Sequence, residues 1–113
     1  MSNKLIHPPL ETPWGRLQSF ELLAPGIFSC STSSHGGYFV DSKVNARIPS
    51  IIKAASHCGN AFDGWYEEDC DWAIVVVCVR RGFDERLFSE AVETLKRFHP
   101  VAWTCLKTLK KVS

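Results

Sequence analysis

A chain of 113 residues that is 45% hydrophobic and 22% charged can bury one hydrophobic core, and this composition is typical of a folded domain and not of a disordered chain. Nucleic-acid-binding proteins usually carry a strongly positive net charge, whereas the formal net charge of this chain is only +1. We therefore expect no direct nucleic-acid binding. The longest apolar run, Ala73–Val79, is far shorter than the roughly 18 residues of a membrane span, so we expect no membrane partner.

The N-terminal half has the pattern of a small antiparallel sheet. Three prolines and little periodic apolar content predict an extended, irregular lead-in over residues 1–13, ahead of a single domain over residues 14–113. Ala24-Pro25-Gly26 supplies a turn, and the glycines of Ser33–Gly37 permit a second tight return. The predicted strands are Arg16–Leu23, Ile27–Thr32 and Tyr38–Val40.

The C-terminal half has the pattern of helices. Asp41 or Ser42 is suited to cap a short helix that ends at Ala46. Asp84 is a candidate N-cap for a longer helix that ends at Phe98 and carries one apolar stripe. Two further helices are predicted, one over Ser50–His57 and a short one after Pro100.

The segment Glu67–Arg81 is open to two interpretations. Its valines, Val75–Val77, favour a strand, whereas the acids at its start suit the positive end of a helix dipole. We favour a buried helix. The fold class is then α+β, with a small antiparallel sheet from the N-terminal half packed against three to four helices from the C-terminal half.

Residues 65–72 carry the densest chemistry of the chain, because four carboxylates and a thiol lie between aromatic residues. No Lys or Arg occurs between Lys53 and Arg80, so these acids form a local negative field. In the simpler interpretation the acids only cap a helix and the tryptophans belong to the core. The predicted binding residues here are Trp65, Tyr66, Glu67, Glu68, Asp69 and Asp71.

In the motif Ser33–Gly37, two serines precede His35 and two glycines follow it. The backbone N–H groups of the glycines can approach a ligand closely. His35 is therefore a candidate binding residue or general base, although it can equally well serve only its own turn. If this motif and the acidic segment share one cleft, His35 with Glu67 or Glu68 forms an acid–base pair or a divalent-metal site. The sequence does not show that they meet.

The five cysteines are scattered and odd in number, which indicates a reduced, cytoplasmic protein. His57-Cys58, Cys70 and Cys78 lack the close pairs of a zinc site, so we expect no bound metal and no cofactor. Cys70 is a poor nucleophile, because neighbouring carboxylates raise a thiol pKa. His99 stands beside a proline in an expected loop and carries no functional signal.

Several of these motifs also carry a resemblance to known sequences. They are Thr12–Gly15, Ala24–Ile27, Ser34–Gly37 and Trp65–Ala73. Over roughly residues 12–98 the chain resembles an uncharacterised domain family of plasmid, phage and integrative-element proteins. The resemblance implies no activity, but it implies a mobile-element setting, where small proteins act against host defence systems such as CRISPR or restriction.

Two classes of function follow. In the first, the chain is a stoichiometric inhibitor of anti-CRISPR or anti-restriction type, and its partner is a host protein or ribonucleoprotein defence complex. Its acidic surface then imitates nucleic-acid phosphates, with Trp65, Tyr66 and Trp72 as anchors. In the second, a small hydrolase or transferase uses His35 and a carboxylate from Glu67–Asp71, with or without a divalent metal. We expect the first, because no nucleotide-binding, nucleophile-elbow or metalloprotease motif occurs.

Overall fold

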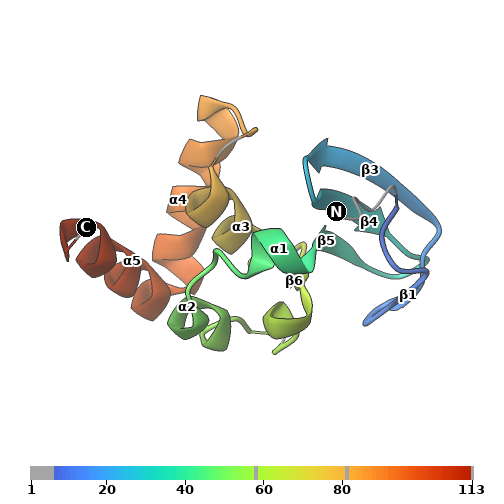
Figure 1. Cartoon of the computed structure of the whole chain (residues 1–113), viewed down its shortest axis with the longest axis horizontal. Helices are drawn as coiled ribbons and strands as arrows, with labels where there is room; N and C mark the ends of the chain where they lie inside the picture. The colour runs from blue at the N-terminus through green and yellow to red at the C-terminus, as the bar shows by residue number, and fades with distance from the viewer. Residues whose placement is uncertain (1–6, 58, 81, 113) are drawn as a thin grey trace.

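A computed structural model describes residues 7–57, 59–80 and 82–112 of the chain. Antiparallel sheets occupy the N-terminal half and helices the C-terminal half, which confirms the predicted α+β class (Figure 1). The strands are β1 (Glu11–Thr12), β2 (Gly15–Arg16), β3 (Ser19–Ala24), β4 (Ile27–Ser31), β5 (Gly36–Val40) and β6 (Trp65–Glu67). The helices are α1 (Ser42–Asn45), α2 (Ser50–Ala54), α3 (Trp72–Val79), α4 (Glu85–Phe98) and α5 (Pro100–Val112), and η1 (Ala61–Asp63) is a 3₁₀ turn.

The main sheet has the order β3-β4-β5-β6, and all of its neighbours are antiparallel. The strands β3, β4 and β5 correspond to the three that the sequence predicts. A small hairpin, β1–β2, lies partly within the predicted irregular lead-in, and Gly15 permits it by adopting a φ of +122°. Residues 1–6 of that lead-in lie outside the described residues.

The short and the long helix begin where the sequence places their caps. The Asp41 carboxylate accepts the backbone N–H of Val44 at 2.9 Å, which caps α1. The Asp84 carboxylate accepts the backbone N–H of Leu87 at 2.8 Å, which caps α4.

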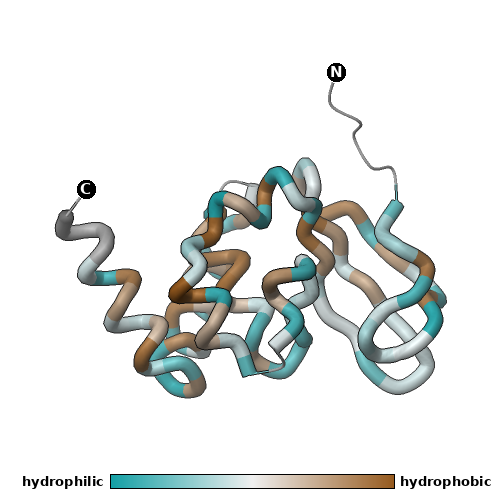
Figure 2. Tube along the Cα trace, turned by 60° about the horizontal axis from the view of Figure 1, so that its bottom comes forward, coloured by the Kyte–Doolittle hydropathy of each residue, from teal (hydrophilic) through white to brown (hydrophobic). Residues whose placement is uncertain are grey.

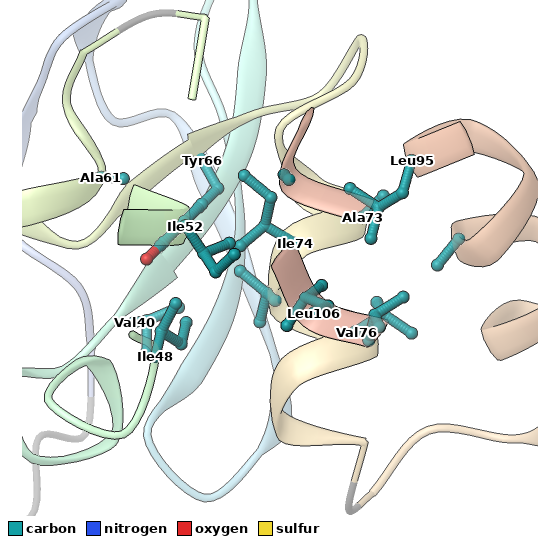
Figure 3. Packing of buried hydrophobic residues seen from close by; sticks show 14 of the residues in the cluster. Val40, Ile48, Ile52, Ala61, Tyr66, Ala73, Ile74, Val76, Leu95 and Leu106 are labelled. Atoms are coloured by element: carbon teal, nitrogen blue, oxygen red, sulfur yellow. The ribbon is translucent and has the colours of Figure 1, made fainter. Parts of the chain in front are cut away.

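Helix α3 is the centre of the core, so the helical interpretation is confirmed for the apolar run. The start of the predicted segment, Glu67–Asp71, is not helical, because Glu67 ends β6 and the next four residues form a turn. Its residues Ala73–Val77 are buried, and it packs against α4 on one side and against β5 and β6 on the other. Burial on nearly all sides explains why three consecutive valines adopt a helix, since packing overrides a weak intrinsic preference for strands. Figure 3 shows Ala73, Ile74 and Val76 of α3 among core residues from the other elements.

Helix α5 is longer than the short helix that the sequence predicts. Pro100 lies at the break between α4 and α5 and is itself the first residue of α5, a position that needs no backbone N–H. The helix packs on α4 and α2 and lies on the side of the molecule away from β3 and β4 (Figures 1 and 2). This packing brings the α4–α5 junction towards the end of α2.

Strand β6 separates two hydrophobic clusters. Successive residues of a strand point to opposite faces, and here Trp65 joins the smaller cluster with Phe28, Cys30 and Phe39. Tyr66 joins the main core, where its hydroxyl donates a hydrogen bond to the Asn45 side chain. Both aromatic residues are therefore buried, in agreement with the simpler interpretation of the tryptophan as a core residue.

Candidate functional site

The two motifs singled out in the sequence meet at one edge of the sheet. Strands β5 and β6 pair in a register that sets Gly37 opposite Glu67. The pairing continues for one residue, because the Glu68 backbone N–H donates to the Gly36 carbonyl at 3.1 Å. The segment that contains His35 therefore runs beside the acidic turn, defined here as Glu67, Glu68 and Asp69.

The glycines of the histidine motif allow this close approach. A Cβ atom on Gly37 would collide with the Tyr66 carbonyl oxygen and would lie 2.6 Å from a ring carbon of Trp14. A Cβ atom on Gly36 would lie 2.8 Å from a carboxylate oxygen of Glu68. A larger residue at Gly37 would push β6 and the acidic turn away from β5, and one at Gly36 would also meet the Cys30 carbonyl of β4.

His35 itself is exposed, and its loop is held by another residue. The Thr32 hydroxyl donates to the His35 carbonyl at 2.7 Å and accepts the His35 backbone N–H at 3.1 Å. Within the described part of the chain, the His35 ring takes part in no hydrogen bond or ion pair that would fix its turn. The side chain is therefore available to a partner or substrate.

The acidic turn forms no ion pair with the Lys and Arg side chains that the structure describes. Glu68 and Asp69 are exposed, and Glu67 is half-buried and accepts the Asp69 backbone N–H at 3.0 Å. The described Lys and Arg side chains form ion pairs only with Glu85 and Glu93. The basic residues of α4 and α5 with described side chains thus leave the charge of the acidic turn in place.

The acidic segment changes direction after Asp69, and its next two residues face inward. Asp71 is fully buried and Cys70 is 8% exposed. The Cys70 sulfur lies 3.4 Å from Nδ1 of His57, and Oδ1 of Asp71 lies 3.1 Å from Nε2 of His99. The rings of His57 and His99 are 4.1 Å apart. These four residues form a second group, which we call the His–Cys–His cluster with its carboxylate Asp71. His57 is exposed, whereas Cys70, Asp71 and His99 are buried.

Asp71 occupies the N-cap position of α3 but does not cap it through its side chain. Its Oδ1 instead accepts the backbone N–H of His57 at 3.0 Å. The interpretation of this acid as a simple helix cap is therefore wrong. The carboxylate ties the end of the α2 segment to the start of α3, within reach of His99.

The charges around Cys70 keep its thiol protonated in the structure as described. Burial, together with the carboxylates of Asp71, Glu67 and Asp69, raises the pKa of Cys70 to about 11, against an opposing backbone hydrogen bond. The thiol therefore does not act as a nucleophile at neutral pH in the absence of a cation.

A family model described as a domain of unknown function (DUF7007) matches residues 7–111. The chain belongs to this family. No curated protein and no solved structure matches the chain significantly. No helix among residues 7–57, 59–80 and 82–112 of this DUF7007 chain is long and apolar enough to cross a membrane.

The residues predicted as a binding site of the DUF7007 chain fall into two groups. His35, Glu68 and Asp69 are exposed on one edge, with Glu67 half-buried beside them. Trp65, Tyr66 and Asp71 are buried, and they hold the acidic turn in place instead of facing a partner.

Sequence reasoning weighed His57 and Cys70 as part of a zinc site and dismissed it, and it gave His99 no role. The two histidines follow different helices, and only the packing of α5 on α2 brings them together with Cys70. In the sequence, both histidines simply stand at the ends of predicted helices, and this position does not indicate a metal site. Cys58, which the sequence placed beside His57, lies outside the described residues.

Proposed function

We propose that this DUF7007 chain is a protein-binding factor that docks through its acidic turn onto a cationic surface of a partner. The observation that carries the proposal is the exposed position of Glu68 and Asp69 on a sheet edge, without an ion pair to the described cations. Uncompensated carboxylates on a rigid edge favour fast, oriented association with a positively charged surface.

The edge is rigid because it is fixed from behind. Tyr66 is anchored in the main core and Trp65 in the smaller cluster, directly before the first carboxylate. A turn held in this way loses little conformational entropy on binding. The aromatic residues therefore contribute by preorganising the charges, and the binding energy comes from the carboxylates.

We further propose a class of partner for the acidic turn. The resemblance to proteins of plasmids, phages and integrative elements favours a host defence complex that handles nucleic acid, and the chain then acts as an inhibitor of anti-CRISPR or anti-restriction type. The Lys- and Arg-rich grooves of such complexes normally hold phosphates, and an acidic turn of fixed shape competes for them.

The test is affinity capture of the tagged chain from a cell lysate at physiological salt, with identification of the retained proteins by mass spectrometry. The decisive variant combines Glu67→Gln, Glu68→Gln and Asp69→Asn. A matched control, Glu11→Gln with Glu21→Gln and Glu90→Gln, removes the same charge from exposed positions elsewhere. We expect the native chain and the control to retain the same nucleic-acid-handling complex, and the decisive variant to lose it.

Two results would contradict this proposal. One is retention of the same proteins by all three forms, because docking would then not depend on the acidic turn. The other is that the native chain captures no protein beyond those that the decisive variant also captures. Elevated salt supplies a further check, since an electrostatic contact weakens as charges are screened.

A second candidate is a small enzyme that uses His35 with Glu67 or Glu68, and one observation favours it. The hydrogen bond between Glu68 and Gly36 places the histidine motif beside these carboxylates. His35→Ala separates the two candidates. An enzyme loses its activity with this substitution while it remains folded, whereas the binding factor retains its partner.

A further inference from the structure

We propose that this chain binds one zinc ion between His57, Cys70 and His99, with Asp71 as the carboxylate that orients the site. This site, in which Cys70 and His99 are buried and His57 is exposed, is distinct from the docking surface formed by the acidic turn. It also differs from the sequence-based expectation of no metal, which rested on the absence of closely spaced ligand pairs.

The donor atoms lie close enough to share one ion, and one pair of them already has tetrahedral spacing. One atom from each of His57, Cys70 and His99 lies within 4.8 Å of the other two. Bonds of about 2.0–2.3 Å to a tetrahedral zinc ion place neighbouring donors about 3.3–3.8 Å apart. The 3.4 Å between the Cys70 sulfur and Nδ1 of His57 falls within this range.

The donor types select the metal. A thiolate with two imidazoles suits zinc and other late transition metals, whereas magnesium and calcium require oxygen ligands. Three protein ligands leave a fourth position for water or for another group, as in zinc sites that interact with a substrate. The donor set therefore points to zinc as the resident ion.

His99 supplies an independent observation that points to a ligand. The side chain is 3% exposed, and neither ring nitrogen has a hydrogen-bond partner of acceptable geometry among the described residues. Its Nε2 lies near Asp71, but the contact is too poorly aligned for a hydrogen bond. Buried polar atoms without partners are costly, and a metal bond to one nitrogen with a proper hydrogen bond from the other removes that cost.

Asp71 occupies the place of an outer-shell carboxylate. Histidine ligands of zinc usually donate their second N–H to a carboxylate or a carbonyl, which fixes the ring and its tautomer. The 3.1 Å between Oδ1 of Asp71 and Nε2 of His99 leaves Nδ1 of His99 to face the ion. The same Asp71 oxygen accepts the His57 backbone N–H, so one carboxylate positions both histidine ligands.

The local field also favours a cation. Oδ1 of Asp71 lies 4.0 Å from the Cys70 sulfur, and Glu67 and Asp69 precede Cys70 in the chain. A divalent cation at Cys70 is attracted by these carboxylates and stabilises the thiolate directly.

The ion would connect three parts of the fold. His57 follows α2, Cys70 precedes α3, and His99 joins α4 to α5. Binding to the folded chain and not to the unfolded chain stabilises the fold by mass action. Zinc removal is therefore expected to lower the melting temperature of the whole helical half.

The first experiment loads the metal-free chain with Co²⁺, whose absorption reports tetrahedral geometry and thiolate ligation. We expect one ion per chain with a sulfur-to-metal charge-transfer band, and displacement of that ion by Zn²⁺. Cys70→Ser, His57→Ala and His99→Ala should each weaken binding by at least about 100-fold, beyond the loss typical of an outer-shell change. Matched controls are Cys105→Ser and His35→Ala, which should bind as the native chain does.

The second experiment needs no substitution, so it remains decisive if a variant fails to fold. X-ray absorption of the zinc-loaded native chain should show one sulfur neighbour at about 2.3 Å and two imidazole nitrogens at about 2.0–2.1 Å. A shell of oxygen atoms only, or Co²⁺ binding that persists unchanged in Cys70→Ser, would overturn the proposal.

The docking proposal and the metal proposal fail separately. The variant that neutralises Glu67, Glu68 and Asp69 keeps all three zinc ligands and should still take up one ion. A chain that binds zinc but captures no partner would contradict only the docking proposal. A chain that captures its partner with no zinc bound and no effect of zinc would contradict only the metal proposal.

Discussion

Oδ1 of Asp71 lies 3.1 Å from Nε2 of His99, and both side chains are buried. A carboxylate without solvent is costly unless charges or hydrogen bonds compensate it. The His57 backbone N–H provides one such hydrogen bond to Asp71. The acidic segment thus has two parts, the exposed acidic turn and the buried carboxylate of Asp71, which contacts His57 and His99.

Asp71→Asn should lower the affinity of the chain for zinc by about 10- to 100-fold, because an amide orients the histidine ligands less strongly than a carboxylate. The measurement is competition with a chromophoric chelator. Asp63→Asn, which changes an exposed acid outside the cluster, is the matched control and should leave the affinity unchanged. Equal affinities of the two variants would show that Asp71 has no role in the site.

Tyr66→Phe should destabilise the fold by about 1–3 kcal/mol, because the buried Asn45 carbonyl oxygen loses its hydrogen-bond donor. The Asn45 amide cannot turn away easily, since its nitrogen donates to the Ala61 carbonyl at 2.7 Å. Urea unfolding measures the change. Tyr38→Phe is the control and should cost less than about 0.5 kcal/mol. A similar loss for both variants would argue against the buried hydrogen bond.

Gly37→Ala should cost about 3 kcal/mol, since its Cβ would meet backbone atoms of Tyr66 and Glu67 that cannot rotate away. Gly59→Ala is the comparison, because a Cβ at Gly59 meets nothing within 4 Å. Its φ of +71° leaves only left-handed strain of about 1 kcal/mol. Thermal unfolding measures both variants. If Gly37→Ala were the milder change, the close β5–β6 pairing would be contradicted.

Alkaline pH should destabilise the metal-free chain. Burial raises the pKa of both Cys30 and Cys70 to about 11, so the folded state resists their ionisation. Their contribution to stability is complete below the ordinary thiol value of 9.0 and is lost as the pH rises towards about 11. Urea unfolding across this window, with chelator present, should show a smaller decline for Cys30→Ala than for the native chain. An equal decline would assign the loss to other groups.

The local features of this fold could be predicted from sequence because their causes lie within a few residues. Asp41 and Asp84 cap helices that begin directly after them. The apolar run of α3 is buried as the helix that we favoured, since its length and composition suit a core element. In each case the residues that determine the structure are neighbours in the chain.

The rest depends on packing between distant segments. Strand β6 has three residues, and its pairing with β5 is not encoded in any local pattern. The burial of Trp65 and Tyr66 follows from hydrophobic clusters on both faces of that strand. The meeting of His57 with His99 requires the packing of α5 on α2, which ligand spacing along the chain cannot reveal.

The most direct test of this account is a crystal structure of the zinc-loaded native chain, with anomalous data collected on both sides of the zinc absorption edge. We predict one strong zinc peak between His57, Cys70 and His99, with Asp71 beside the ring of His99. The acidic turn should carry no comparable peak. A zinc peak only at Glu67, Glu68 and Asp69, or no peak at Cys70, would contradict the two-part organisation of this segment.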